Sequence, residues 1–296
     1  LNAFAVADIG TVDLGVLANY QVVILGEMAL SPAQAAMLSD WVNAGGNLIA
    51  MRPDSDLYAL LGISAAGGAP LAEGYFLVNA TTAPGKGIVA ETMQYHGAAD
   101  RYTLNGAAAV ATLYSDVATA TASPAVTLRS LGGSESPDGG QAAAFAFDLA
   151  RSIVYTRQGN PAWAGQERDG VTPIRPDDLF FGAAAGDVKP DWVNLAKVAI
   201  PQADEAQRLL ANLILNMNAD RMPLPRFWYF PRGEKAVVVM THDNHGGGDT
   251  LARLNSYNAA SPANCSLDNW ECVRSTTYPF ADVALTDAQL AAFQAQ

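Results

Sequence analysis

The clearest pattern along the chain is a short apolar run, a helical repeat and a second apolar run between residues 20 and 54. The first run, "QVVILG", is typical of a buried strand. In "SPAQ", Ser31 stands at the N-cap, Pro at the first helical position and Gln at the third, which predicts a helix that starts with a capping box. Gly45 and Gly46 end this helix, and "NLIAM" is the next strand. A strand, a helix and a strand in about 30 residues predict a βαβ unit with two parallel strands.

Weaker patterns follow up to residue 220. The runs "AVATLYS", "AVTLRS" and "QAAAFAFDLA" predict strands, and "GGSESPDGG" predicts a turn. The segment "QADEAQRLLANLILNMNA" predicts a long amphipathic helix with one apolar face: Leu209, Leu210, Leu213, Ile214 and Met217. Ahead of it, "RQGNPAWAGQERDGVTPIRPDDLF" is too long for an ordinary connection, which indicates a functional or an interface loop.

A proline-rich aromatic stretch, "PLPRFWYFPRG", predicts an extended linker and places a domain boundary near Met222. We therefore predict an α/β domain over residues 1–222 and a second domain over residues 223–296. The second begins with a strand at 236–240 and a helix in "DTLARLNSYNAA". Thr286 and Gln289 form another capping box, which starts one more helix. About 70 residues are too few for a complete second domain, so we expect it to be incomplete.

Charge and hydropathy exclude several classes of partner. The chain carries a net charge of −12, and only 16% of its residues are charged, which argues against binding to nucleic acid. No apolar run reaches the roughly 18–20 residues needed to cross a bilayer, so we expect no membrane span. The N-terminal residues show no basic region followed by an apolar one, and no signal peptide is visible.

The two cysteines of the chain, Cys265 and Cys272, lie in "CSLDNWEC". There is no second cysteine pair and no histidine at zinc-ligand spacing, which argues against a structural zinc site. A local disulfide that closes a small loop is the favoured interpretation, and two reduced thiols are the alternative.

The stretch "YQVVILGEMALSPAQAAMLSDWVNAGGNLIAMRP" resembles the class I glutamine amidotransferase-like fold. The resemblance implies a flavodoxin-like parallel sheet. It would also imply a cysteine nucleophile, but residues 1–222 contain no cysteine, so we expect this domain to be non-catalytic. Glu27 ends the first strand, where open α/β sheets bind ligands, although a capping or solvated carboxylate is equally compatible with its place. His96 is either a ligand contact or, as we favour, a structural histidine.

The long polar loop holds candidates for sugar binding. Trp163, Gln166, Glu167 and Arg168 could bind a carbohydrate, because aromatic faces and planar polar groups suit sugar rings. A contact with another domain or with another copy of the chain is the alternative that we favour for the same residues.

In the second segment, "AVVVMTHDN" resembles the first motif of the polysaccharide deacetylases of carbohydrate esterase family four. There an apolar strand ends in T-F-D-D, the first Asp is the general base, and the second binds the metal together with a later H-x-x-x-H motif. Thr241 matches the leading threonine, and Asp243 matches the catalytic base. Asn244 stands at the metal-binding Asp and is a poorer ligand. His242 replaces the usual aromatic residue, and His245 adds an imidazole.

The resemblance implies a deacetylase-type (β/α) barrel, of which residues 223–296 form the first part. It also implies a divalent metal, with zinc expected, held near Asn244, His242 and His245, and an acetylated glycan as substrate. We therefore expect a secreted or periplasmic, metal-dependent carbohydrate deacetylase-type hydrolase with an inactive amidotransferase-like domain. A non-catalytic scaffold that binds glycans or a partner is the alternative function. For the loop itself, an ordinary glycine-rich turn is the alternative.

Overall fold

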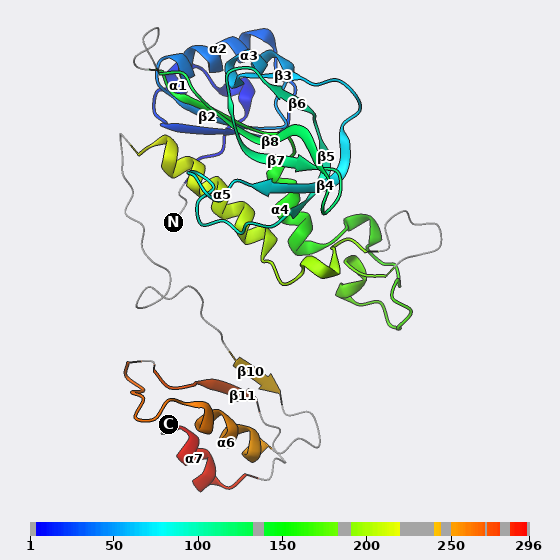
Figure 1. Ribbon diagram of the computed structural model, residues 1–296, viewed down its shortest axis with the longest axis vertical. Helices are drawn as coiled ribbons and strands as arrows, with labels where there is room; N and C mark the ends of the chain where they lie inside the picture. Colours follow the sequence, from blue (N-terminus) through cyan, green and yellow to red (C-terminus); the bar gives the residue numbers. More distant parts are fainter. Residues whose placement is uncertain are drawn as a thin grey trace. The chain divides into compact units, whose positions relative to one another are not determined.

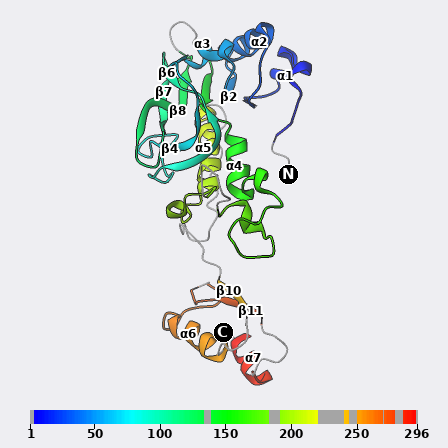
Figure 2. The same ribbon diagram turned by 90° about the vertical axis from the view of Figure 1, so that its right-hand side faces the viewer.

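The computed structural model describes residues 4–132, 139–182, 191–219, 240–243, 250–269, 271–278 and 285–294, with the backbone alone for 240–243 and 277. The chain divides into two compact units, Leu1–Leu224 and Pro225–Gln296, which are described separately below. Figures 1 and 2 show the elements of each unit from two directions.

Unit 1 is built on a seven-stranded sheet with the order β1-β2-β9-β8-β7-β4-β5. The strands are β1 (Val22–Leu25), β2 (Asn47–Met51), β4 (Leu71–Val78), β5 (Met93–Ala99), β7 (Ala108–Tyr114), β8 (Ala120–Ser130) and β9 (Gln141–Phe145). Strands β1, β2 and β9 are parallel, and the other pairings are antiparallel. The α/β class is as expected, but the expected flavodoxin-like parallel sheet is not found, because the parallel part covers only three of the seven strands. A parallel neighbour requires a long crossover, whereas the short stretch 115–119 joins β7 directly to β8.

The predicted βαβ unit is confirmed. Helix α2 (Pro32–Asn43) begins with the capping box of Ser31 and Gln34, and β1 pairs with β2 in parallel, with Val22 opposite Asn47. Helix α2 buries Leu38 and Val42 completely. Gly46 is required after it because a Cβ at this position would lie 2.2 Å from the ring of Trp41.

Helices α4 (Leu149–Gln158) and α5 (Gln202–Met217) pack against each other (Figure 1). The predicted apolar face of α5 is confirmed, since Leu209, Leu213 and Met217 are buried in the main core. The side chain of Asn47, at the start of β2, is also buried. Its amide donates to the carbonyl of Met217 at 3.0 Å and accepts from the backbone N–H of Gln141 at 2.9 Å, so it joins β2, β9 and α5.

Helix α5 also holds the connection between β4 and β5. Four of its side chains bond the backbone of segment 84–94: Gln202 accepts from Gln94, Glu205 accepts from Val89, Arg208 donates to Gly87 and Asn212 donates to Pro84. Because these bonds are spread along three turns of a rigid helix, the connection has a fixed position against the sheet.

The remaining elements of unit 1 are short. Helix α1 (Leu14–Leu17) precedes β1, and α3 (Tyr58–Leu61) follows β2. Strands β3 (Ile63–Ala65) and β6 (Tyr102–Leu104) form a small antiparallel sheet. Within the long polar loop, two 3-10 turns, Pro161–Trp163 and Pro176–Leu179, surround a second small core of Trp163, Trp192 and Val193.

Unit 2 contains β10 (Met240–Asp243), α6 (Thr250–Ala260), β11 (Ser275–Tyr278) and α7 (Asp287–Gln294). Strands β10 and β11 are parallel, with Met240 opposite Ser275. The predicted helices are confirmed as α6 and α7, and the Thr286–Gln289 capping box is formed. Residues 236–239 of the predicted first strand lie outside the described residues, and the strand described there starts at Met240.

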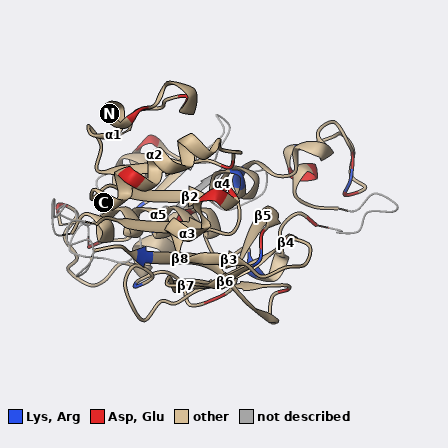
Figure 3. Cartoon of the chain, turned by 90° about the horizontal axis from the view of Figure 1, so that it is seen from above, with Lys and Arg blue, Asp and Glu red and all other residues tan. Residues whose placement is uncertain are grey.

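Charged side chains are sparse over the whole molecule, and most of the chain in Figure 3 is neither acidic nor basic. Among the described helices, none combines the length and the apolar character that a bilayer crossing requires.

Candidate functional site

The first candidate site lies at the carboxyl end of the parallel strands of unit 2. His242 and Asp243 are the last two residues of β10, and Asp243 is opposite Tyr278, the last residue of β11. The helix α6 joins the two strands, so their carboxyl ends share one edge. The side chains of His242 and Asp243 lie outside the described part of the structure, as do Asn244 and His245 entirely.

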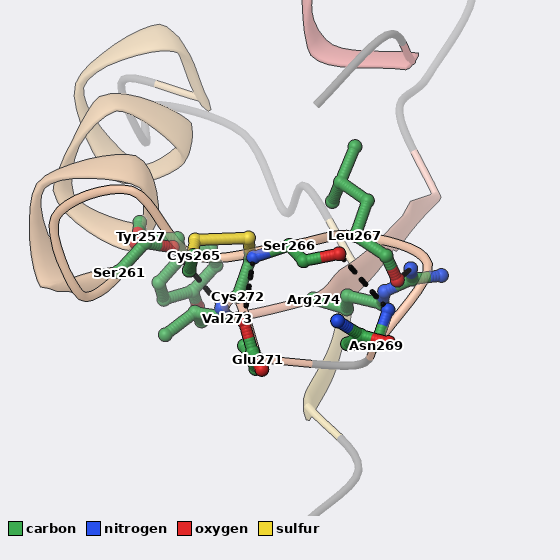
Figure 4. The surroundings of a disulfide bond; sticks show 10 residues. All are labelled: Tyr257, Ser261, Cys265, Ser266, Leu267, Asn269, Glu271, Cys272, Val273 and Arg274. Carbon is green, nitrogen blue, oxygen red and sulfur yellow. Dashed lines mark hydrogen bonds between the residues drawn. A yellow bond between two sulfur atoms is a disulfide. The ribbon is translucent and has the colours of Figure 1, made fainter.

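The predicted disulfide between Cys265 and Cys272 is present, with sulfur atoms 2.08 Å apart (Figure 4). Glu271 accepts from the backbone N–H of Ser266 across the base of the loop, at 2.9 Å. Arg274 donates to the carbonyl of Leu267. The loop comes between α6 and β11, so it lies at the amino end of β11, away from the edge that holds His242 and Asp243.

A second candidate site is an ion cluster at the carboxyl ends of the parallel strands of unit 1. Arg52 follows β2 and pairs with Glu27, which follows β1, at 2.6 Å, and with Asp100 at 3.2 Å. Each of the three side chains keeps about a quarter of its surface exposed, 24–29%. The backbone of Arg52 donates to the carbonyl of Phe145 at the end of β9, so the cluster lies where β2 and β9 meet.

Two properties distinguish Arg52 from an ordinary surface arginine. Its φ is 44°, a left-handed value that few residues other than glycine adopt. Burial acts to lower its pKa, but the carboxylates of Asp100 and Glu27 outweigh burial and raise the pKa above its usual value. Strained backbone at the edge of an open α/β sheet is a common property of ligand sites. The guanidinium binds both carboxylates, so the cluster keeps one net negative charge and has no free cation to offer an anionic ligand.

The structure brings Trp163 and Arg168 together. The guanidinium carbon of Arg168 lies 3.6 Å from the centroid of the Trp163 ring, which is itself 8% exposed. Arg168 also donates to the carbonyl of Gly182 at 3.0 Å and to the side chain of Gln166 at 3.1 Å. A sugar could therefore stack on this face of Trp163 only after Arg168 moved. The sugar-binding role of these residues stays a prediction.

Glu167 belongs to a cluster of three acids with Asp169 and Asp178, whose ligand oxygens all lie within 4.8 Å of one another. Carboxylates at this spacing are of a type that can hold a divalent cation. In this structure they hold the loop itself. Glu167 accepts from Gly170 and Val171, at 2.7 and 3.1 Å.

Asp178 is the organising residue of this cluster. It is buried, and it accepts the backbone N–H groups of Arg175, Arg168 and Asp169, at 2.8 to 3.2 Å. The N–H of Arg175, followed by that of Arg168, lowers the pKa of Asp178. We did not predict Asp178 from the sequence, although "RPDD" places Pro at the first position of a helical turn and an acid at the third, which is a capping pattern.

His96 is 2% exposed, and its ring stacks on that of Trp192 with centroids 4.2 Å apart. Its backbone N–H donates to Ser152 at 3.1 Å, and Trp192 donates to the carbonyl of Tyr155 at 3.0 Å. This position joins the main sheet to the second core, which agrees with the structural role favoured from the sequence.

Comparison with known proteins gives no family. No protein-family profile and no curated protein sequence matches the chain. Among solved structures, a β-galactosidase from Rahnella sp. R3 is similar over 43% of this chain and 20% of its own, with 23% identity and a TM-score of 0.32. An exo-β-1,4-mannosidase from Opitutaceae bacterium strain TAV5 is similar over 47% and 23%, with 16% identity and a TM-score of 0.35. A cytoplasmic protein from Salmonella typhimurium is similar over 46% and 64%, with 13% identity and a TM-score of 0.35. The chain thus spans about a fifth of each glycosidase, and these similarities are too weak to indicate a function.

Proposed function

We propose that the chain is part of a carbohydrate deacetylase-type hydrolase. In this proposal, residues 223–296 begin a polysaccharide deacetylase-like (β/α) barrel, and residues 1–222 form an amidotransferase-like accessory domain. The observation that carries the proposal is the parallel β10–α6–β11 arrangement with His242 and Asp243 at the carboxyl end of β10. In (β/α) barrels this end of the strands holds the catalytic residues.

In the proposed reaction Asp243 is the general base. Its carboxylate takes a proton from a water molecule that attacks the carbonyl carbon of an acetyl group on the glycan. The bond between that carbon and the sugar nitrogen or oxygen then breaks, and the protonated carboxyl of Asp243 returns the proton to that nitrogen or oxygen, so that acetate and the deacetylated sugar leave. A bound divalent cation, with zinc expected, would polarise the acetyl carbonyl. His242, His245 and Asn244 would hold the cation, because imidazole nitrogens and an amide oxygen are donors that such a cation accepts.

The accessory role of residues 1–222 is supported by their composition, since they contain no cysteine and cannot supply a thiolate nucleophile. The disulfide in unit 2 is compatible with the secreted or periplasmic location that we propose. The second candidate function is a scaffold that binds glycans without catalysis. Asn244 favours it, because a neutral amide is a weaker cation ligand than the carboxylate of the related motif.

Metal content and acetate release test the proposal. Zinc bound after dialysis and acetate released from acetylated chito-oligosaccharide and xylan are measured for this chain and for a longer form of the protein, if its gene encodes one. Asp243→Ala should lose acetate release, because no base remains, and should weaken zinc binding. Asp268→Ala, which removes an exposed acid of the same unit, should change neither. Absence of zinc and of acetate release in both proteins would refute the hydrolase. Glycan binding that survives replacement of His242, Asp243 and His245 would then favour the scaffold.

A further inference from the structure

Unit 1 contains a hollow of about 400 Å³ at the ends of β7 and β8, apart from every site described above. Its apolar lining residues include Ala108 and Ala109 of β7 and Leu128 of β8, which we call its floor. Three further lining residues, which we call its rim, have side chains that can form hydrogen bonds: Asn79, Thr82 and Ser130. Its volume falls in the range of pockets that bind small molecules, about 300–1,000 Å³.

The walls of this hollow are fixed by bonds to the rest of the unit. Segment 79–85 supplies another part of the lining, and Asn212 of α5 donates to the carbonyl of Pro84 in it, at 2.8 Å. Gly85 packs so closely that a Cβ there would lie 2.1 Å from the carbonyl oxygen of Asn79. A pocket with preformed walls loses little conformational entropy when a ligand binds.

The chemistry of the lining selects the ligand. Among the described residues that line the hollow, none is ionisable or aromatic. A charged ligand would therefore lose its hydration without a compensating charge, and a nucleobase would find no ring to stack on. The side-chain hydroxyls of Thr82 and Ser130 make no hydrogen bond to the described part of the protein, and Asn79 uses only its oxygen, which accepts from Thr81.

We propose that this hollow binds an uncharged sugar, as one or two rings of a neutral glycan. The C–H face of a sugar ring would lie on the floor of small apolar side chains, and its hydroxyl groups would bond to the rim. This goes beyond the proposed hydrolase, because it gives unit 1 a binding site of its own. It depends on none of the residues at the carboxyl end of β10.

Saturation-transfer NMR and calorimetry with neutral mono- and disaccharides, including glucose, galactose, mannose, xylose and N-acetylglucosamine, test the proposal on the whole chain. The filling variant is Ala108→Phe, since Ala108 is paired with Leu128 on the floor. Ala120→Phe is the matched control, because Ala120 is an equally exposed alanine of the same sheet outside the hollow. At least one sugar should bind with a Kd of about 1 mM or below, and Ala108→Phe should weaken it about tenfold or more. Ala120→Phe should leave binding unchanged.

Ser130→Ala removes one rim hydroxyl with little risk to folding and should weaken binding about fivefold, the effect of one hydrogen bond. Failure of every neutral sugar to bind at about 10 mM would overturn the proposal. Binding that Ala108→Phe and Ser130→Ala leave unaffected would also overturn it, as would preferential binding of sulfated or acidic sugars. Acetate release is measured separately, so loss of the hydrolase activity and loss of this site are distinguishable.

Discussion

The buried amide of Asn47 gives the sharpest test of how unit 1 is held together. Replacing it with leucine keeps the number and branching of the side-chain heavy atoms but removes the donor to the carbonyl of Met217 and the acceptor for the N–H of Gln141. Leaving a buried polar group without a partner costs about 1–3 kcal/mol. Asn47 and Met217 are almost completely buried, whereas Gln141 is partly open to water, so we expect Asn47→Leu to lower the free energy of unfolding by about 2–4 kcal/mol.

Urea unfolding followed by tryptophan fluorescence measures this loss. Asn105→Leu is the control, since Asn105 is exposed, and it should change the stability by no more than about 0.5 kcal/mol. Asn47→Asp tests the direction in which the stability changes with pH. Burial raises the pKa of the new carboxyl group, and its protonated form can donate to Met217 as the amide does. Relative to wild type, this variant should be most stable near pH 4 and should lose stability as the pH rises through the raised pKa. If Asn47→Leu costs no more than Asn105→Leu, the bonds of Asn47 do not join these elements as described.

Three further outcomes follow from the packing and the loops. Replacing both Cys265 and Cys272 with serine should destabilise unit 2 by about 2.5 kcal/mol, because the sequence separation of 7 closes a short loop, and faster hydrogen exchange in unit 2 would measure this loss. Gly46→Ala should lower the free energy of unfolding by about 1–3 kcal/mol, because the new methyl group clashes with a tryptophan ring. Gly26→Ala should leave it nearly unchanged, because the space around Gly26 is open, and thermal unfolding of both variants measures the difference. Asp178→Ala should speed hydrogen exchange at the three backbone N–H groups that donate hydrogen bonds to Asp178. Equal exchange rates in the variant and the wild type would contradict this. In the wild type, the lowered pKa of Asp178 means that this protection holds above about pH 4 and is lost only as the pH falls through the lowered value.

The sequence was most informative where local rules and packing agree. The capping box at Ser31, the two glycines after it and the apolar face of 202–217 are each determined by neighbours in the chain, and all are found. In the antiparallel part of the sheet, the strands predicted at "AVATLYS" and "AVTLRS" are found as β7 and β8, but β4, β5 and the antiparallel pairing were not predicted. The pairing of β4 with β5 has a register shift, and these strands contain small residues such as Gly74 and Gly97, which weaken the alternation of apolar and polar positions. Their pairing also depends on distant partners, which a local pattern does not reveal.

In the candidate sites, too, features set by neighbours in the chain could be predicted, whereas contacts between distant segments could not. Glu27 was recognised as lying at a strand end, but its partners Arg52 and Asp100 come from other strands and meet only in the folded sheet. Arg168 and Trp163 are close in sequence, yet the stacking of one on the other depends on the turn between them. The hollow at the ends of β7 and β8 is formed by backbone and small side chains, so no distinctive residue marks it in the sequence.

The position of β9 between β2 and β8 has a consequence for how the protein is made. Gln141 bonds to Asn47, which is synthesised 94 residues earlier, and the last partner of Asn47, Met217, follows 170 residues after it. On the ribosome, β1, α2 and β2 can assemble early, but one edge of β2 has no partner until β9 emerges. An open strand edge is prone to wrong pairing, and contacts between distant segments form slowly. The interval between the synthesis of β2 and that of β9 is therefore when the nascent chain is most exposed to misfolding and has most need of chaperones.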